Sequence, residues 1–135
     1  MIAVIDTGPW VALIDRSKSR HAECVKWLSE FSGRLYSTEA VLTEVLYLLN
    51  FSITAQCATL DFVLESVVDI VPANTKSLKK AKNLMKKYAE LPLDYADATI
   101  VCLAAETGMQ NVVTFDRKNF AIYKLPKKQS FMLMP

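Results

Sequence analysis

The sequence has few of the residues that staple small secreted domains or build the commonest catalytic sites. Its 135 residues include three glycines, three cysteines and one histidine. Cys24, Cys57 and Cys102 are widely spaced and form no CxxC pair, so they suggest neither a disulfide framework nor a zinc site. We predict that they are reduced core residues. His21 alone leaves almost no material for histidine-dependent triads or His-ligated zinc.

Glycine-rich phosphate loops and long hydrophobic runs are also missing. No GxGxxG or GxxxxGK(S/T) motif occurs, which removes the usual cradles for dinucleotides and nucleoside triphosphates. No apolar run approaches the roughly 20 residues that a membrane-spanning helix needs. The apolar residues 2–5 follow no basic leader and end at an acid, unlike a signal peptide. We therefore expect a soluble, cytoplasmic protein with no membrane partner.

The composition is that of one packed domain. Hydrophobic residues make up 52% and charged residues 22% of the chain, which excludes intrinsic disorder. The length favours a single domain over residues 1–135. Residues 1–75 carry five Lys/Arg and nine Asp/Glu (net −4), whereas residues 76–135 carry eleven and five (net +6). The second part is therefore a candidate surface for a polyanion.

Short β-branched runs alternate with segments of helical periodicity. We expect strands at residues 2–5, 35–37, 67–71, 111–114 and 130–134, and helices at residues 22–31, 39–50, 54–66, 77–89 and 95–107. The tetrapeptide Asp6-Thr7-Gly8-Pro9 is typical of a turn that ends the first strand. Since such alternation requires crossover helices, the sequence predicts an α/β three-layer sandwich with a mainly parallel central sheet.

Acidic residues lie in otherwise apolar surroundings where a parallel sheet would bind a ligand. Asp6 and Asp116 each follow a predicted strand, and the carboxyl ends of strands form the ligand crevice of open α/β sheets. Glu44 and Asp97 lie inside apolar helical segments, and Asp94 is a further candidate. Clustered carboxylates without His or Cys select Mg²⁺ or Mn²⁺. We therefore predict a divalent metal site.

Each of these acids also has a purely structural interpretation. Asp6 and Asp94 suit helix N-caps, and Asp97 suits the first turn of the helix that Asp94 would begin. Asp116 fits a polar turn, and Glu44 fits the wet side of its helix. A purely structural role for all of these acids together is less plausible than a purely structural role for any one of them.

Hydroxyl and basic residues accompany the acids. Thr7, Thr43 and Thr114 adjoin three of them and either position carboxylates and waters or make ordinary turn and helix hydrogen bonds. The lysines of residues 77–89 form either a solvated helix face or a phosphate-binding surface. The candidate RNA-binding residues are Lys79, Lys80, Lys86, Arg117, Lys118, Lys124, Lys127 and Lys128.

Four segments in this order resemble the PIN domain, in particular the VapC-type toxin ribonucleases. They are Val4–Pro9, Val41–Val45, Leu93–Ala98 and Val113–Phe120. The resemblance covers nearly the whole chain and implies a PIN-like sandwich.

The resemblance also implies roles for individual residues. Asp6, Glu44, Asp97 and Asp116 match the family's metal-binding acids, and Asp94 matches an extra acid of one branch with an Asp-x-x-Asp-Ala pattern. The sequence departs from the family pattern at position 119, where an asparagine stands in place of the second acid that many relatives have. We expect the aspartates at 6, 97 and 116 to hold the metal and the glutamate at 44 to position or deprotonate the attacking water.

At the level of function, the resemblance implies an endoribonuclease that uses Mg²⁺ or Mn²⁺ to cut structured RNA such as transfer RNA. It implies the toxin of a VapBC-type toxin–antitoxin pair, a homodimer whose cognate antitoxin inserts its tail into the active-site groove. The residues alone support only an acidic, metal-binding crevice in an α/β domain with a basic flank.

Three other protein classes share part of this pattern. A haloacid-dehalogenase-like phosphatase also has an aspartate at the end of its first strand, but Gly8 occupies the place of its second aspartate. Asp-Thr-Gly occurs in aspartic proteases, which are all-β, whereas this chain is rich in helical periodicity. A non-catalytic PIN-fold module, whose acidic pocket binds RNA or a basic partner, stays open at this point.

Overall fold

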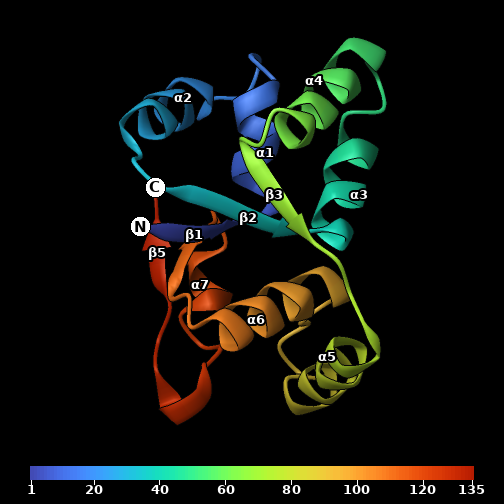
Figure 1. The fold of residues 1–135 in the computed structure, drawn as a ribbon, viewed down its shortest axis with the longest axis vertical. Coiled ribbons are helices and arrows are strands. Elements are labelled where there is room, and N and C mark those ends of the chain that lie inside the picture. Colours follow the sequence, from blue (N-terminus) through green and yellow to red (C-terminus); the bar gives the residue numbers. More distant parts are fainter.

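A computed structural model of the protein describes residues 1–135, which fold around a five-stranded parallel sheet (Figure 1). The elements in chain order are β1 (Ile2–Ile5), α1 (Thr7–Ile14), α2 (His21–Glu30), β2 (Arg34–Thr38), α3 (Glu39–Leu48), α4 (Ile53–Leu64), β3 (Val68–Val71), α5 (Thr75–Lys87), α6 (Tyr95–Thr107), β4 (Asn111–Val113), α7 (Arg117–Phe120), a 3₁₀ turn (Pro126–Lys128) and β5 (Met132–Met134). The strand order is β3-β2-β1-β4-β5.

The sheet lies between two helical layers. Helices α1 to α4 cover one face, and α5, α6 and α7 lie on the other (Figure 1). All four strand pairs are parallel. The predicted three-layer α/β sandwich is therefore confirmed. None of the helices combines the length and hydrophobicity needed to cross a bilayer.

The core centres on β1, the middle strand, and its neighbour β4. Residues Ala3, Val4 and Ile5 of β1 and Val112 and Val113 of β4 are at most 1% exposed. Central strands of a parallel sheet are covered on both faces, which is why they are continuous apolar runs rather than alternating ones. Their carboxyl ends emerge at one edge of the sheet, where the candidate site lies.

The prediction of a turn after β1 was wrong, because helix α1 begins there directly. Asp6 is extended and its side chain accepts a hydrogen bond from the backbone N–H of Thr7, so it is the N-cap of α1. Pro9 lies in the first helical turn, where a missing N–H breaks no intrahelical bond. Turn-forming residues therefore start a helix here, and they hold the Asp6 carboxylate at its N-terminus.

Smaller differences concern helix ends and one cysteine. Helix α5 begins at Thr75 rather than residue 77, because Asn74 and Ser77 form a reciprocal capping box. The short helix α7 was not predicted. Cys24 and Cys102 are buried as expected, whereas Cys57 is exposed on α4, so the prediction that it belongs to the core was wrong.

Gly33 makes the entry into β2 possible. An added Cβ would overlap the backbone carbonyl of Met1, which accepts a hydrogen bond from Arg34 N at 3.0 Å. We expect Gly33→Ala to lower the free energy of unfolding by about 1–3 kcal/mol, as overpacking typically does. Urea denaturation measures this. The exposed neighbour Ser32 is the control, and Ser32→Ala should stay within about 0.5 kcal/mol of wild type. Equal stability of Gly33→Ala and wild type would contradict the overlap.

Candidate functional site

The site is built on a contact between the ends of β1 and β4. The parallel register pairs Ile5 with Val113. The next residues of the two strands, Asp6 and Thr114, therefore lie side by side, and the Thr114 hydroxyl donates to Asp6 Oδ2 at 2.8 Å. The other carboxylate oxygen, Oδ1, accepts from the backbone N–H of Thr7 at 2.8 Å. Both oxygens of this carboxylate are thus held in a fixed orientation.

Thr114 also connects Asp6 to Asp116. The backbone N–H of Asp116 donates to the Thr114 hydroxyl oxygen at 3.0 Å. Asp116 is the N-cap of α7, and it accepts hydrogen bonds from the backbone and side-chain nitrogens of Asn119 at 3.3 and 3.2 Å. The asparagine that departs from the family pattern therefore orients one of the acids. The structure joins Asp6, Thr114 and Asp116 into one hydrogen-bonded network.

Asp97 enters from the N-terminus of α6. Its backbone N–H donates to Asp94 Oδ1 at 2.8 Å, and the backbone N–H of Asp94 donates back to Asp97 Oδ2 at 3.4 Å. Asp94 is therefore the N-cap, as the structural interpretation expected. The pair fixes the start of α6 at the acidic end of the sheet.

The remaining predicted site residues differ in their surroundings. Glu44 is half-buried on α3, and its charge acts on Asp6. The Thr43 hydroxyl is exposed and donates to the backbone carbonyl of Glu39 at 2.9 Å. The Thr7 hydroxyl is buried with no partner. Of the three threonines, Thr114 alone hydrogen-bonds to an acid through its side chain.

The acids lie near one another, and no basic side chain balances them. Burial raises the pKa of Asp6 to about 6; hydrogen bonds from Thr7 and Thr114 oppose the shift, and the charges of Glu44 and Asp116 add to it. None of these acids takes part in an ion pair. The ion pairs of the chain are Arg20–Glu23, Arg34–Asp69 and Lys80–Glu106.

Asp97 is perturbed in the same direction. Burial raises its pKa to about 8, and the negative charges of Asp94 and Asp6 contribute. A bound divalent cation is one way to relieve the repulsion among such groups.

The donor chemistry of the site fits Mg²⁺ or Mn²⁺, since the available ligands are carboxylate oxygens. In this structure, however, no group of three or more acidic, Cys or His side chains is arranged to hold an ion. Mg²⁺ usually retains several waters and uses one or two carboxylates rather than a complete protein cage. Metal binding here would therefore need bridging waters or rotation of the acids.

Sequence reasoning missed Tyr123. Its side chain is fully buried, it packs edge-on against Tyr88 and Phe120 with ring centroids 5.2 Å apart, and its hydroxyl has no hydrogen-bond partner. Burial, and then the charges of Asp97 and Asp116, raise the pKa of this phenol. The tyrosine thus lies close enough to the acids to feel their field. Its spacing in the sequence resembles any core aromatic, so no signal distinguished it.

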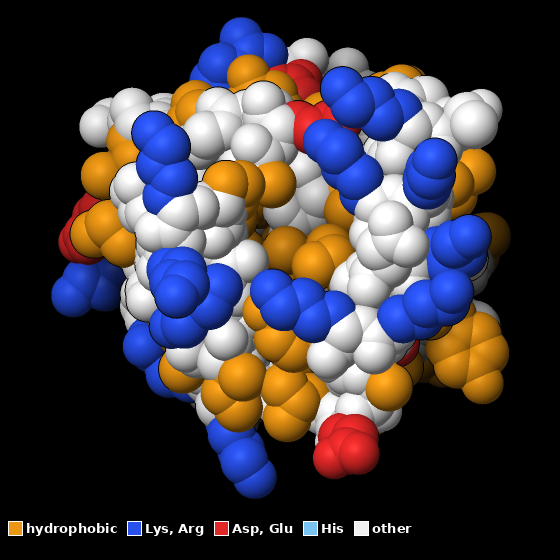
Figure 2. Space-filling model, turned by 90° about the horizontal axis from the view of Figure 1, so that it is seen from below, with side chains coloured by type: hydrophobic (Ala, Val, Ile, Leu, Met, Phe, Trp, Pro, Cys, Tyr) orange, Lys and Arg blue, Asp and Glu red, His pale blue; other side chains and the backbone are white.

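Basic side chains border a hollow on the side of the molecule where α5 lies. Figure 2 views the molecule from the side of α5 and the loop before β5, and shows Lys and Arg on both sides of a depression floored by hydrophobic side chains. Lys118 is exposed at the start of α7. Lys80 pairs with Glu106 at 3.7 Å, and Arg117 donates to the carbonyl of Pro135 at 2.6 Å. The predicted basic surface thus includes residues with internal partners and residues free to contact a ligand.

Comparison with known proteins identifies the family. The model of the PIN domain matches residues 3–126. The chain belongs to the PIN domain family. The resemblance seen in the sequence is thereby confirmed at the level of the family. No curated protein sequence matches this PIN domain.

Several solved structures with the same fold are toxins or toxin–antitoxin complexes. Mycobacterium tuberculosis VapC20, described as a Sarcin-Ricin loop cleaving toxin, has a TM-score of 0.79 and 24% identity over 86% of this chain and 91% of its own. VapBC2 from Rickettsia felis, bound to a DNA fragment from its promoter, has a TM-score of 0.69 and 18% identity over 100% of both chains. A toxin–antitoxin complex from Klebsiella pneumoniae has a TM-score of 0.68 and 20% identity over 88% and 90%. At these identities the likeness shows a shared fold.

The raised pKa values predict how the stability of this PIN domain depends on pH without metal. Folded Asp6 and Asp97 keep protons that the unfolded chain releases above its ordinary pKa of 3.8. Their contribution to stability is therefore greatest near pH 4 and falls as pH rises towards 8. In EDTA, we expect Asp97→Asn to unfold at a higher temperature than wild type at pH 8, by about 3 °C or more, and the gap to shrink towards pH 5.

Thermal unfolding followed by circular dichroism between pH 5 and pH 8.5 measures this gap. Asp61→Asn, on the exposed face of α4, is the matched control and should track wild type throughout. A constant difference between Asp97→Asn and wild type across this range would argue against a raised pKa at Asp97.

Proposed function

We propose that this PIN domain is an endoribonuclease that depends on Mg²⁺ or Mn²⁺ and acts as the toxin of a VapBC-type toxin–antitoxin pair. The observation that carries the proposal is the hydrogen-bonded network of Asp6, Thr114 and Asp116. It holds unpaired carboxylates at the carboxyl ends of two adjacent parallel strands, beside Asp97 at the start of α6. Such a set of carboxylates suits a divalent cation that acts on a phosphodiester. It fits the sites of a haloacid-dehalogenase-like phosphatase or an aspartic protease less well.

In this proposal, each acid has a distinct task. Asp6, Asp97 and Asp116 hold the ion directly or through waters, with Glu44 and Asp94 as further candidate ligands. A bound divalent ion would lower the pKa of a coordinated water and stabilise the leaving oxyanion. Thr114 and the N–H of residue 7 keep the Asp6 carboxylate oriented. Glu44 positions the attacking water or accepts its proton.

The substrate contacts follow from the charge distribution. Lysines flanking the hollow in Figure 2 would bind phosphates on either side of the cut, chiefly through counterion release. The proposed RNA-binding residues are Lys79, Lys80, Lys86, Arg117 and Lys118. A structured RNA such as transfer RNA is the proposed substrate, and the similarity to VapC20, a Sarcin-Ricin loop cleaving toxin, supports a folded RNA target.

Protein partners are part of the proposal. Several structures of the same fold are VapBC complexes, which supports a cognate antitoxin. Tyr47, Phe51 and Ile53 are about 70% exposed around the α3–α4 junction, and exposed apolar side chains of this size are typical of protein interfaces. We propose that this PIN domain forms a homodimer, is neutralised by an antitoxin and acts in the cytoplasm.

A second candidate function is a non-catalytic module whose acidic pocket binds RNA or a basic partner. It is favoured by one observation, the lack of three acids arranged around a common point. Metal-dependent cleavage distinguishes the two functions. Both predict binding of RNA or a partner, but the ribonuclease alone predicts cleaved RNA fragments.

Replacing Asp6 by Asn tests the proposed enzyme. With Mn²⁺ and total cellular RNA, wild type should produce discrete fragments on a gel. Asp6→Asn should cut at least about 100-fold more slowly, since even the outer partners of metal ligands are worth about 10- to 100-fold. EDTA should stop the wild-type reaction. Asp61→Asn should cut as wild type does. Cleavage by Asp6→Asn at the wild-type rate would remove this residue from the mechanism.

Replacing Lys118 by Ala tests the proposed phosphate contacts. In the Asp6→Asn background, Lys118→Ala should weaken RNA binding about equally for different sequences and reduce the slope of log K against log salt by about 1. Anisotropy titrations between 50 and 200 mM KCl, on the order of physiological salt, measure the slope. Lys26 on α2 lies on the opposite helical layer, so Lys26→Ala should leave both quantities unchanged. If Lys118→Ala leaves the slope of log K against log salt unchanged, Lys118 does not contact an RNA phosphate.

A further inference from the structure

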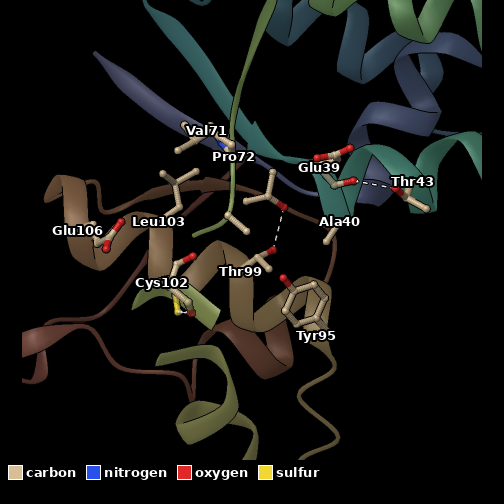
Figure 3. Close-up of a pocket in the computed structure, with 13 residues that line it drawn as sticks. Glu39, Ala40, Thr43, Val71, Pro72, Tyr95, Thr99, Cys102, Leu103 and Glu106 are labelled. Carbon is tan, nitrogen blue, oxygen red and sulfur yellow. Dashed lines mark hydrogen bonds between the residues drawn. The ribbon is translucent and has the colours of Figure 1, made fainter. Parts of the chain in front are cut away.

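A cavity of about 260 Å³ opens beside the acids, between α3, the N-terminus of α5 and one face of α6 (Figure 3). Tyr95 and Thr99 line it from one face of α6, and Asp97, two residues from each, lies on another face of the same helix. Thr43 lines it from α3. Its size is below that of most drug-sized ligand pockets and suits a single flat group. Its position relative to Asp6 follows from the register of the sheet.

The floor of the cavity lies level with the acidic site. The register of β1 and β2 pairs Val4 with Tyr36. Two residues further on, Asp6 and Thr38 reach the same level at the carboxyl edge of the sheet. Thr38 lines the cavity, so a group bound there would be adjacent to Asp6 across one strand spacing.

The threonine and serine hydroxyls that line the cavity each donate their proton to an acceptor within the protein. Thr99 donates to the carbonyl of Ala96 at 2.6 Å, so Thr38 is the donor in the 2.8 Å bond between the two threonine hydroxyls (Figure 3). The hydroxyls of Thr43 and Ser77 donate to backbone carbonyls at 2.9 and 3.0 Å. What these groups offer a ligand is lone pairs, because a hydroxyl has one proton and two acceptor sites.

The charged residues that line the cavity also favour a hydrogen-bond donor as the ligand. No Lys or Arg lines the cavity, whereas Glu39 and Glu106 do. Glu106 is paired with Lys80, and Glu39 has no ion pair. A phosphate would meet acceptors and a carboxylate and is therefore disfavoured. A neutral group with N–H donors would satisfy the free lone pairs.

Tyr95 supplies a stacking surface. It is the first residue of α6 and is 39% exposed, and Ala40 and Pro72 are among the apolar residues that also line the cavity. Bases stack on such rings with little dependence on sequence, so the ring would hold the base plane while the acceptors select its edge.

We infer that this cavity binds an adenine or cytosine base of the RNA strand, next to the phosphate that is cut. The inference rests on the proposed ribonuclease function. The two N–H groups of the exocyclic amine would donate to the hydroxyl oxygen of Thr99 and to the Glu39 carboxylate. Uracil has no exocyclic amine, and the two carbonyl groups that flank its single N–H donor would face acceptors and stay unpaired. The cavity therefore makes the enzyme prefer adenine or cytosine to uracil at one position.

A basic side chain of a protein partner is the competing occupant, since a guanidinium is also a donor. The single unpaired carboxylate of the lining, Glu39, lies on the exposed first turn of α3, whereas the acceptors at the floor are neutral hydroxyls. A neutral flat donor matches this arrangement better than a cation does.

Binding of short oligonucleotides to the Asp6→Asn protein in EDTA tests the inference without any cleavage. The probes are labelled hexauridylate and the same oligomer with one central adenosine or cytidine, measured by fluorescence anisotropy. At least one substituted oligomer should bind about fivefold or more tightly than hexauridylate. Equal affinities for all three would overturn the inference.

Variants locate the preference. Thr99→Val should abolish it, while Thr99→Ser, which keeps the hydroxyl, should preserve it. Tyr95→Ala should weaken binding of the preferred oligomer about tenfold, and Tyr95→Phe should not. Glu39→Gln is the second test should Thr99→Val fail to fold, and it too should reduce the preference. A preference that survives both Thr99→Val and Glu39→Gln would overturn the inference.

Two comparisons separate this inference from its rivals. If wild type cuts RNA with Mn²⁺ but the oligomers bind equally, the base site is wrong and the proposed function stands. If the preference is present but no RNA is cut, the base site stands and the proposed function is wrong. If acetyl-arginine amide shifts the NMR signals of Tyr95 and the oligomers do not, the cavity belongs to a protein partner and the inference is overturned.

Discussion

The hydrogen bond from Thr114 to Asp6 is the contact on which the site depends. It joins residues 108 positions apart in the chain, and it exists because β1 and β4 are neighbours in the parallel register. Since helix α1 begins directly at Asp6, the same carboxylate ends a strand, caps a helix and receives the threonine proton. A shift of one residue in the pairing of β1 with β4 would turn these side chains to opposite faces of the sheet. The buried valines of β4 prevent that shift.

Several acids at one edge of the sheet repel one another and lose contact with water, which lowers the stability of the folded state. Hydrogen bonds from the surrounding structure offset part of this loss. Asp6, Asp94 and Asp116 each cap a helix N-terminus, where backbone N–H groups and the helix dipole stabilise negative charge. The same hydrogen bonds that lower the cost of these charges also restrict how the carboxylates point. The structural and the metal-binding interpretations of the acids are therefore compatible, because a carboxylate oxygen that accepts one hydrogen bond keeps a further lone pair for a ligand.

The sequence predicted the layers and the strands well, because continuous apolar runs and 3.6-residue periods depend on local spacing. It failed where one local signal permits two outcomes: Asp-Thr-Gly-Pro suits a turn as well as the first turn of a helix, and the neighbouring sheet decides between them. The candidate acids could be named because apolar surroundings make a carboxylate conspicuous. Tyr123 and the Thr38–Thr99 bond could not be named, since each acquires its environment from packing between residues far apart in the chain.

The surface next to the acids divides the recognition of RNA into three parts of different chemistry. Lysines attract phosphates over distances of about 10 Å and are sensitive to salt. The acids repel phosphates until a cation is present, so productive binding in the proposed function is coupled to the metal. The cavity beside them offers acceptors and no cation, and it can thus contribute selectivity with little salt dependence. Affinity and sequence preference should therefore respond to different residues, because counterion release acts on the backbone of any RNA, whereas unpaired lone pairs discriminate between bases.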